Sequence, residues 1–126
     1  ARLRPGTVIG PNSHIGNFVE IKKTNIKKNS KVNHLSYLGD SNIGENVNIG
    51  AGVITCNYDG SKKNKTKIED NVFVGSNASL VAPIKLNKNS IVGAGSVITE
   101  SVKENALAVE RNEQRIFPNY KKNRRK

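Results

Sequence analysis

The chain has two histidines, His14 and His34, and His34 begins the run His-Leu-Ser-Tyr-Leu-Gly at 34–39. An imidazole with a pKa of about 6.5 takes up and releases protons at neutral pH, so His34 is a candidate general base. A single histidine is more often structural, and that alternative stays open. Two histidines are too few for a three-histidine zinc site, so we predict no metal.

Cations near the N-terminus form a second candidate group that contains Arg2, Arg4, Lys22 and Lys23. Arg4 and Lys22 are eighteen residues apart, which is the length of one coil. The two cations would therefore stack ~5 Å apart, and they would repel each other by about 1 kcal/mol even in water. A bound phosphate would turn this repulsion into binding. The alternatives are chance stacking on a lysine-rich surface and simple charge pairing of Glu20 with Lys22 or Lys23.

A third candidate is the segment 55–66, in which Asn57-Tyr58-Asp59-Gly60 is a turn signal and several lysines follow. This segment is either a surface loop without a task or a flap that supplies cations and backbone N–H groups to an anionic ligand.

These residues must be positioned by elements with a six-residue period, because aliphatic side chains recur every six residues from Ile68 to Ile98. A period of 3.6 would indicate a helix and a period of 2 a strand, whereas six is typical of a hexapeptide β-helix. Three extended hexads close a triangular coil with the aliphatic side chains inside and Gly or Asn at the corners. We therefore predict an all-β, left-handed parallel β-helix of about five coils, headed by Ile9, Ile26, Ile43, Ile68 and Leu86. The long interval between Ile43 and Ile68 places an inserted loop near 56–66.

Length and composition fit one such domain. The chain has 126 residues, a net charge of +11, no Trp or Met, and a single cysteine, Cys56, which excludes an intrachain disulfide. No apolar run is long enough for a membrane span or a signal peptide. The hexads are already in phase by Leu3, so we expect 1–111 to be a fragment of a longer β-helix. Residues 112–126 form a basic tail, interpreted as a solvated terminus in preference to a nucleic-acid contact.

Several longer runs of residues are similar to one family. They are 1–6, 16–23, 34–40, 48–60 and 72–76. Together they resemble the C-terminal acetyltransferase domain of the bacterial bifunctional N-acetylglucosamine-1-phosphate uridyltransferase / glucosamine-1-phosphate acetyltransferase. The resemblance covers 1–111 and adds little over 112–126.

The resemblance implies transfer of acetyl from acetyl-CoA to the 2-amino group of glucosamine 1-phosphate. His34 matches the general base, Glu20 the carboxylate that orients it, and the backbone N–H of Tyr58 the donor to the developing oxyanion, a contact commonly worth ~3 kcal/mol. The sugar-phosphate ligands correspond to Arg4, Lys22 and Lys63, and the positions that hold the sugar to Tyr37, Asn48 and Asn57. Residues that line the acetyl-CoA site correspond to Ala51, Ser76, Ala94 and Arg111.

The same resemblance implies a cytoplasmic homotrimer with its active sites between subunits, without nucleic acid or a membrane span. Acetyl-CoA would be a co-substrate and no cofactor would be bound covalently. Mg²⁺ would serve only the uridyltransferase domain, for which this chain has no Gly-rich phosphate loop.

Two other functions stay open. A hexapeptide acyltransferase with another acceptor is one, although Arg4 and Lys22 favour a phosphorylated acceptor. A non-enzymatic basic solenoid that binds nucleic acid is the other. It would need a continuous basic face, which is interrupted by Asp40, Glu45, Asp59, Glu69 and Asp70.

Overall fold

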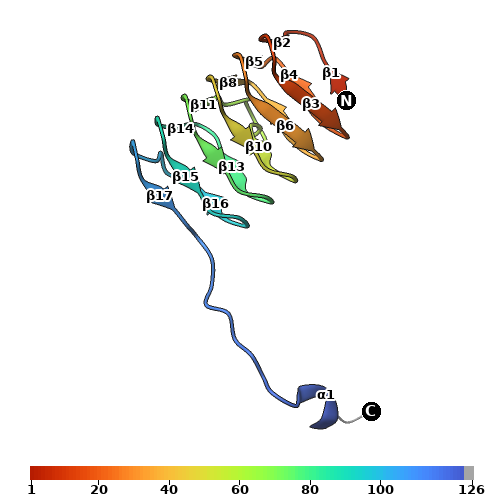
Figure 1. The fold of residues 1–126 in the computed structure, drawn as a ribbon, viewed down its shortest axis with the longest axis vertical. Helices are drawn as coiled ribbons and strands as arrows, with labels where there is room; N and C mark the ends of the chain where they lie inside the picture. Colours follow the sequence, from red (N-terminus) through yellow and green to blue (C-terminus); the bar gives the residue numbers. More distant parts are fainter. Residues whose placement is uncertain (124–126) are drawn as a thin grey trace.

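Short extended segments separated by sharp corners stack into three parallel sheets (Figure 1). The computed structural model describes residues 1–123. Sheet A is built, in spatial order, from β1 (Arg2–Leu3), β4 (Glu20–Lys22), β7 (Tyr37–Gly39), β10 (Ile54–Cys56), β13 (Ser79–Val81) and β16 (Val97–Ile98). Sheet B contains β2 (Val8–Ile9), β5 (Asn25–Ile26), β8 (Ser41–Ile43), β11 (Thr66–Ile68) and β14 (Ile84–Leu86). Sheet C contains β3 (His14–Asn17), β6 (Lys31–His34), β9 (Asn48–Ile49), β12 (Phe73–Val74), β15 (Ile91–Val92) and β17 (Leu107–Ala108).

The aliphatic residue that heads each hexad points into the prism between the three sheets. Leu3 pairs with Ile21, which pairs with Leu38 in sheet A, and Ile26 pairs with Ile43 in sheet B. From the second turn on, these side chains are buried and form one continuous core. Burial of each such side chain contributes roughly 1.5–3 kcal/mol, so the stacked hexads stabilise the fold without large aromatic residues. The predicted hexapeptide-repeat β-helix is confirmed.

The number of turns differs from the prediction. Sheets A and C each have six strands, so the chain makes six turns instead of about five. In sheet B the sixth turn is only an isolated bridge between Leu86 and Val102. Val102 follows Ile98, the aliphatic residue that heads the preceding hexad, by four residues instead of six. Six-residue intervals therefore do not reveal the last turn.

Asparagine occupies the corner between sheets B and C in every turn. These corner residues have φ between 56° and 63° and are Asn12, Asn29, Asn46, Asn71, Asn89 and Asn105. This left-handed region costs most L-residues energy, but the short polar side chain of Asn tolerates it. The asparagines therefore fix the sharp bend that closes each triangle.

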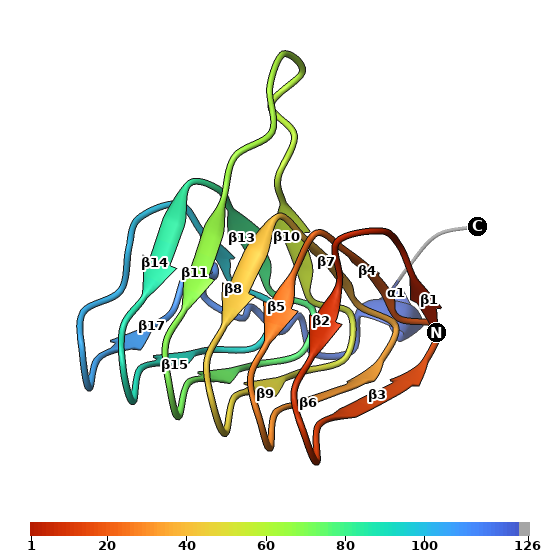
Figure 2. The ribbon, with the colours of Figure 1, turned by 90° about the horizontal axis from the view of Figure 1, so that it is seen from above.

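The predicted insertion is confirmed between β10 and β11, where the chain leaves the prism and returns. Figure 2 shows this loop standing away from the stacked turns. An antiparallel bridge joins Tyr58 to Lys63. At the tip, hydrogen bonds from the Lys62 backbone N–H, the Asn64 side-chain amide and the Ser61 backbone N–H lower the pKa of the Asp59 carboxyl. The tip is thus an ordered turn built around one carboxylate.

After β17 the chain leaves the prism, and the described residues finish with the one-turn helix α1 (Tyr120–Asn123) (Figure 1). Apolar side chains in this segment, such as Ile116 and Phe117, are exposed. Arg124, Arg125 and Lys126 of the predicted basic tail lie outside the described residues, and the boundary at 111/112 stays a prediction. Among the described residues, no helix has the length and apolar character needed to cross a membrane.

Candidate active site

Arg4 and Lys22 occupy neighbouring turns at the same edge of sheet A. Leu3 pairs with Ile21, which sets the two following residues side by side as their spacing predicted. The side chains take different partners: Arg4 Nη1 lies 3.2 Å from Glu20 Oε2, whereas Lys22 Nζ lies 3.4 Å from Asp40 Oδ2. Each cation of this edge is thus held by its own carboxylate.

A polar cluster lies where β7 meets the base of the insertion. It consists of Lys22, Tyr37, Asp40, Asn57 and Lys63. The Asn57 side-chain amide Nδ2 donates to Asp40 Oδ2 at 2.7 Å and to the Tyr37 hydroxyl at 3.2 Å. The Lys22 and Asp40 side chains are only 7% and 11% exposed, so their ion pair is largely shielded from solvent. Such shielding strengthens electrostatic contacts compared with those on an open surface.

Gly39 makes room for this cluster. A Cβ added at Gly39 would lie 2.5 Å from Asn57 Nδ2 and still closer to the Tyr37 hydroxyl. Because Gly39 pairs with Lys22, the bare backbone leaves a gap in the outer row of sheet A just above that lysine. The tyrosine and asparagine side chains meet in this gap.

Two lysines share the cluster from different parts of the chain. Hydrogen bonding with Lys63 and the negative charge of Asp40 raise the pKa of Lys22, against the effect of burial. The neighbouring Lys22 in turn lowers the pKa of Lys63. Lys63 therefore gives up its proton more readily than an ordinary lysine, and an anion placed between the two side chains would relieve their repulsion.

His34 ends β6 and lies at the corner between sheets C and A, with Asn17 as its strand partner. Its side chain is exposed. Its carbonyl oxygen accepts hydrogen bonds from the Ser36 hydroxyl at 3.0 Å and from the Gly52 N–H at 3.4 Å. The described hydrogen bonds include none between His34 and Glu20, and Glu20 Oε2 accepts one from Arg4 Nη1. The predicted orientation of His34 by Glu20 stays a prediction.

Three of the residues predicted to line the acetyl-CoA site continue a column that begins at His34. Backbone hydrogen bonds at this corner run from Gly52 to His34, from Asn77 to Ala51 and from Gly95 to Ser76. In each case the residue that follows a column member donates its backbone N–H to the carbonyl oxygen of the column member in the preceding turn. The column therefore stacks His34, Ala51, Ser76 and Ala94 in successive turns. All four members reach the surface. Three of the four side chains are small, so the column is a shallow strip of wall against which an extended ligand can lie.

Arg111 and Asn48 flank this column. A Cβ added at Gly93 would lie 2.8 Å from Arg111 Nη2, so the guanidinium lies over Gly93, beside Ala94. Asn48 lies in β9 with Lys31 and Phe73 as neighbours in the outer row of sheet C. Tyr58 is on the insertion, 61% exposed, with no described hydrogen bond to the column. Four of the predicted residues thus belong to the polar cluster, which follows β7, and four to the column at the corner between sheets C and A. The others, which belong to neither group, are Arg4, Glu20, Asn48, Tyr58 and Arg111.

The sequence reasoning missed Asp40 as a member of the cluster and treated it only as an interruption of the basic surface. The spacing gave only part of the signal, because this turn has seventeen residues: Gly39 pairs with Lys22, and Asp40 follows Gly39 directly. Gly39 was missed as well, since the distance between a glycine and its neighbours in other turns cannot be read from a hexad.

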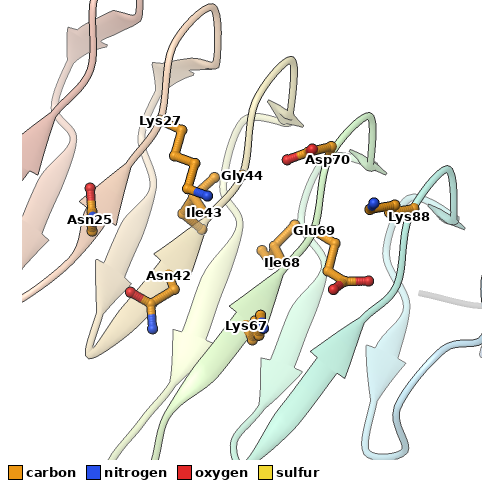
Figure 3. A pocket seen from close by; sticks show the side chains of 10 residues that line it. All are labelled: Asn25, Lys27, Asn42, Ile43, Gly44, Lys67, Ile68, Glu69, Asp70 and Lys88. Atoms are coloured by element: carbon orange, nitrogen blue, oxygen red, sulfur yellow. The ribbon is translucent and has the colours of Figure 1, made fainter.

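A separate groove of about 440 Å³ crosses the outer face of sheet B (Figure 3). It opens above Gly44, which has no side chain, and lies beside Lys27 and Asp70. Asp70 Oδ1 accepts a hydrogen bond from the Glu45 backbone N–H at 2.8 Å, and Lys85 pairs with Glu69 at 3.7 Å. None of the predicted site residues lines it.

Comparisons with known proteins agree with the repeat and extend it. Residues 65–100 match the family model described as the hexapeptide repeat of succinyl-transferase. The "Bifunctional protein GlmU" of Thermosipho melanesiensis is 64% identical over 114 residues, which cover 90% of this chain and 25% of that protein. The GlmU of Thermodesulfovibrio yellowstonii is 56% identical over 126 residues, 100% of this chain and 28% of that protein. This chain is a relative of the bifunctional GlmU proteins. The resemblance predicted from the sequence is confirmed, and the chain spans about a quarter of the length of these GlmU relatives.

Solved structures with little sequence identity share the fold. AntD, an N-acyltransferase from Bacillus cereus in complex with dTDP-4-amino-4,6-dideoxyglucose and coenzyme A, has a TM-score of 0.80 at 18% identity, covering 91% of this chain and 75% of AntD. The acetyltransferase domain of PglB from Neisseria gonorrhoeae, in complex with acetyl coenzyme A, has a TM-score of 0.76 at 18% identity, covering 86% of this chain and 51% of that chain. At this identity the likeness concerns the fold.

Proposed function

We propose that this chain transfers the acetyl group of acetyl-CoA to the 2-amino group of glucosamine 1-phosphate, which gives N-acetylglucosamine 1-phosphate for UDP-N-acetylglucosamine synthesis. The observation that carries the proposal is the polar cluster. Lys22 from a turn of the prism and Lys63 from the insertion converge there beside a tyrosine and an asparagine, and the Lys22–Asp40 ion pair is largely shielded from solvent. A phosphate needs such cations, and sugar hydroxyls need such neutral hydrogen-bonding groups.

In this proposal Lys22, Lys63 and Arg4 bind the phosphate, while Tyr37, Asn48 and Asn57 hold the sugar. The column of Ala51, Ser76 and Ala94 receives the pantetheine arm of acetyl-CoA, and Arg111 pairs with the phosphates of the coenzyme. Small side chains suit this role because the arm must lie flat along the coil wall. The 64% identity to the GlmU protein of Thermosipho melanesiensis over 114 residues supports the proposal as a whole.

The reaction needs one proton carrier. The amine nitrogen of the substrate attacks the thioester carbonyl carbon, and His34 takes a proton from this amine as it does so. The backbone N–H of Tyr58 donates to the oxyanion that develops, and Glu20 steadies the imidazolium. The C–S bond then breaks, and the CoA thiolate leaves and receives the proton from His34. Burial raises the pKa of the Cys56 thiol, which disfavours a cysteine nucleophile and favours direct transfer.

We further propose that the protein acts as a homotrimer in the cytoplasm, with each site completed between subunits. Tyr58 supports this arrangement, because it lies on a loop that stands away from its own prism (Figure 2). A neighbouring subunit would bring such a loop to the column.

A thiol-release assay with acetyl-CoA tests the reaction. Glucosamine 1-phosphate should release CoA thiol and gain the mass of one acetyl group. Glucose 1-phosphate, which offers hydroxyls and no amine, should release none, and glucosamine should react slowly. Equal rates with all three acceptors, or no release with glucosamine 1-phosphate, would refute the proposal.

A further inference from the structure

Asp40 connects the end of one turn to the end of the insertion through its backbone. Its N–H donates to the Lys22 carbonyl oxygen at 3.0 Å, and its own carbonyl oxygen accepts from the Thr66 N–H at 3.2 Å. Thr66 is the first residue of β11, where the chain re-enters the prism after the insertion. Asp40 has a φ of 50°, a left-handed conformation that aspartate tolerates better than most residues.

The side chain of Asp40 reaches the other end of the insertion. Asp40 Oδ2 accepts the 2.7 Å hydrogen bond from Asn57, directly after β10, and lies 3.4 Å from Lys22 Nζ. One residue therefore contacts the point where the insertion leaves the prism, the point where it returns, and a lysine of the polar cluster. Lys63, the other lysine of the cluster, lies on the insertion itself.

The negative charge of Asp40 also offsets the repulsion between Lys22 and Lys63. Two ammonium groups side by side repel each other, and the repulsion grows as solvent is excluded. Among the described ion pairs, Asp40 provides the carboxylate that pairs with Lys22. Without it, the insertion would carry Lys63 away from Lys22 whenever no anion is bound.

We propose that Asp40 is a positioning residue that ties the insertion to the prism, so that Asn57 and Lys63 stand beside Lys22 before the sugar phosphate arrives. The role in substrate binding rests on the function proposed above. The tie itself is a property of the fold. Preorganisation of this kind lowers the entropy that binding must overcome.

Two substitutions separate the hydrogen bond from the charge. Asp40→Asn retains an oxygen that accepts from the Asn57 amide, and asparagine suits the left-handed backbone. Asp40→Ala removes the acceptor. Glu45→Ala is the matched control, since it removes one negative charge that pairs with Lys28 at 3.8 Å, outside the polar cluster.

Steady-state kinetics give the first readout. Asp40→Ala should raise the KM for glucosamine 1-phosphate about tenfold or more, the loss expected for one hydrogen bond to a charged group. The KM for acetyl-CoA should stay within about twofold, because the column does not touch Asp40. Glu45→Ala should stay within about threefold of the wild type for both substrates. Asp40→Asn keeps the hydrogen-bond acceptor but loses the negative charge, so its KM for glucosamine 1-phosphate should lie between those of the wild type and Asp40→Ala. An Asp40→Ala enzyme with unchanged KM for the sugar phosphate, or an Asp40→Asn enzyme as impaired as Asp40→Ala, would overturn the proposal.

Hydrogen–deuterium exchange of residues 57–66 gives a readout that needs no activity. Asp40→Ala should speed exchange in this segment at least about fivefold. Asp40→Asn should speed it less, and Glu45→Ala should leave it as in the wild type. Unchanged exchange in Asp40→Ala would refute the tie. If the wild type did not acetylate glucosamine 1-phosphate, the proposed function would fail, and the exchange comparison would still decide the role of Asp40.

Discussion

The Tyr37 hydroxyl accepts a hydrogen bond from the Asn57 side-chain amide at 3.2 Å, across the bare backbone of Gly39. The two residues are twenty apart in the sequence and meet because successive turns stack. Neither side chain could keep its place if a methyl group occupied the gap. The polar cluster therefore depends on a glycine that takes no part in chemistry.

Gly39→Ala tests this dependence. The added methyl group should displace Tyr37 and Asn57, lower the free energy of unfolding by about 1–3 kcal/mol, and raise the KM for glucosamine 1-phosphate. Denaturant unfolding and steady-state kinetics measure the two effects. Asn42→Ala, on the exposed face of sheet B, is the control and should change neither. A fully stable and fully active Gly39→Ala protein would show that the gap can open without cost.

His34→Ala should abolish acetyl transfer without harming the fold. The imidazole is exposed, and the described hydrogen bonds of His34 use its carbonyl group, which alanine retains. The melting temperature and the affinity for CoA, measured by calorimetry, should therefore match the wild type. Unchanged turnover would remove His34 from the mechanism.

The pH dependence of substrate binding should reveal Lys63. Its pKa is lowered by Lys22 below the ordinary lysine value of 10.5. As the pH rises through this lowered pKa, Lys63 loses its charge, so the KM for glucosamine 1-phosphate should begin to rise before ordinary lysines titrate. Lys63→Met should have a higher KM at neutral pH and no further rise in this window.

The same shift predicts a change in stability. Between the lowered pKa of Lys63 and 10.5, the unfolded chain binds more protons at this site than the folded chain, so the contribution of Lys63 to stability increases with pH there. Lys22 behaves in the opposite way: its pKa is raised, and the stabilisation that it contributes is lost only above 10.5. Urea unfolding across this range measures the free energy of unfolding of Lys63→Met and of the wild type. The difference between the two free energies should shrink as the pH rises. A constant difference would contradict the charge contact.

The hexads made the prism predictable because each aliphatic head has one way to be buried. The loop could be predicted as well, since the turns have sixteen to eighteen residues and the longer interval between Ile43 and Ile68 requires an insertion. The sixth turn could not, because the step from Ile98 to Val102 breaks the period. Stacking of Arg4 on Lys22 follows from sequence spacing and strand register alone.

Side-chain partners were harder to predict than positions. Glu20 was considered as a charge partner for Lys22 or Lys23, yet it pairs with Arg4, because the long side chains of one sheet edge can reach diagonally to either neighbour. Asp40 instead pairs with Lys22. Rotamer choice among several charged groups of similar reach depends on local packing, which a repeat pattern does not describe.

Lys22→Ala offers the most direct test of the account, through the preference for a phosphorylated acceptor. We would compare kcat/KM for glucosamine 1-phosphate with kcat/KM for glucosamine in the wild type and in this variant. The wild type should favour the phosphorylated sugar by about 100-fold or more, and the variant should lose at least about tenfold of that preference, as expected for one charged contact. Equal use of both sugars by the wild type, or an undiminished preference in Lys22→Ala, would contradict the claim that the prism and its insertion bring Lys22 and Lys63 together to bind a sugar phosphate.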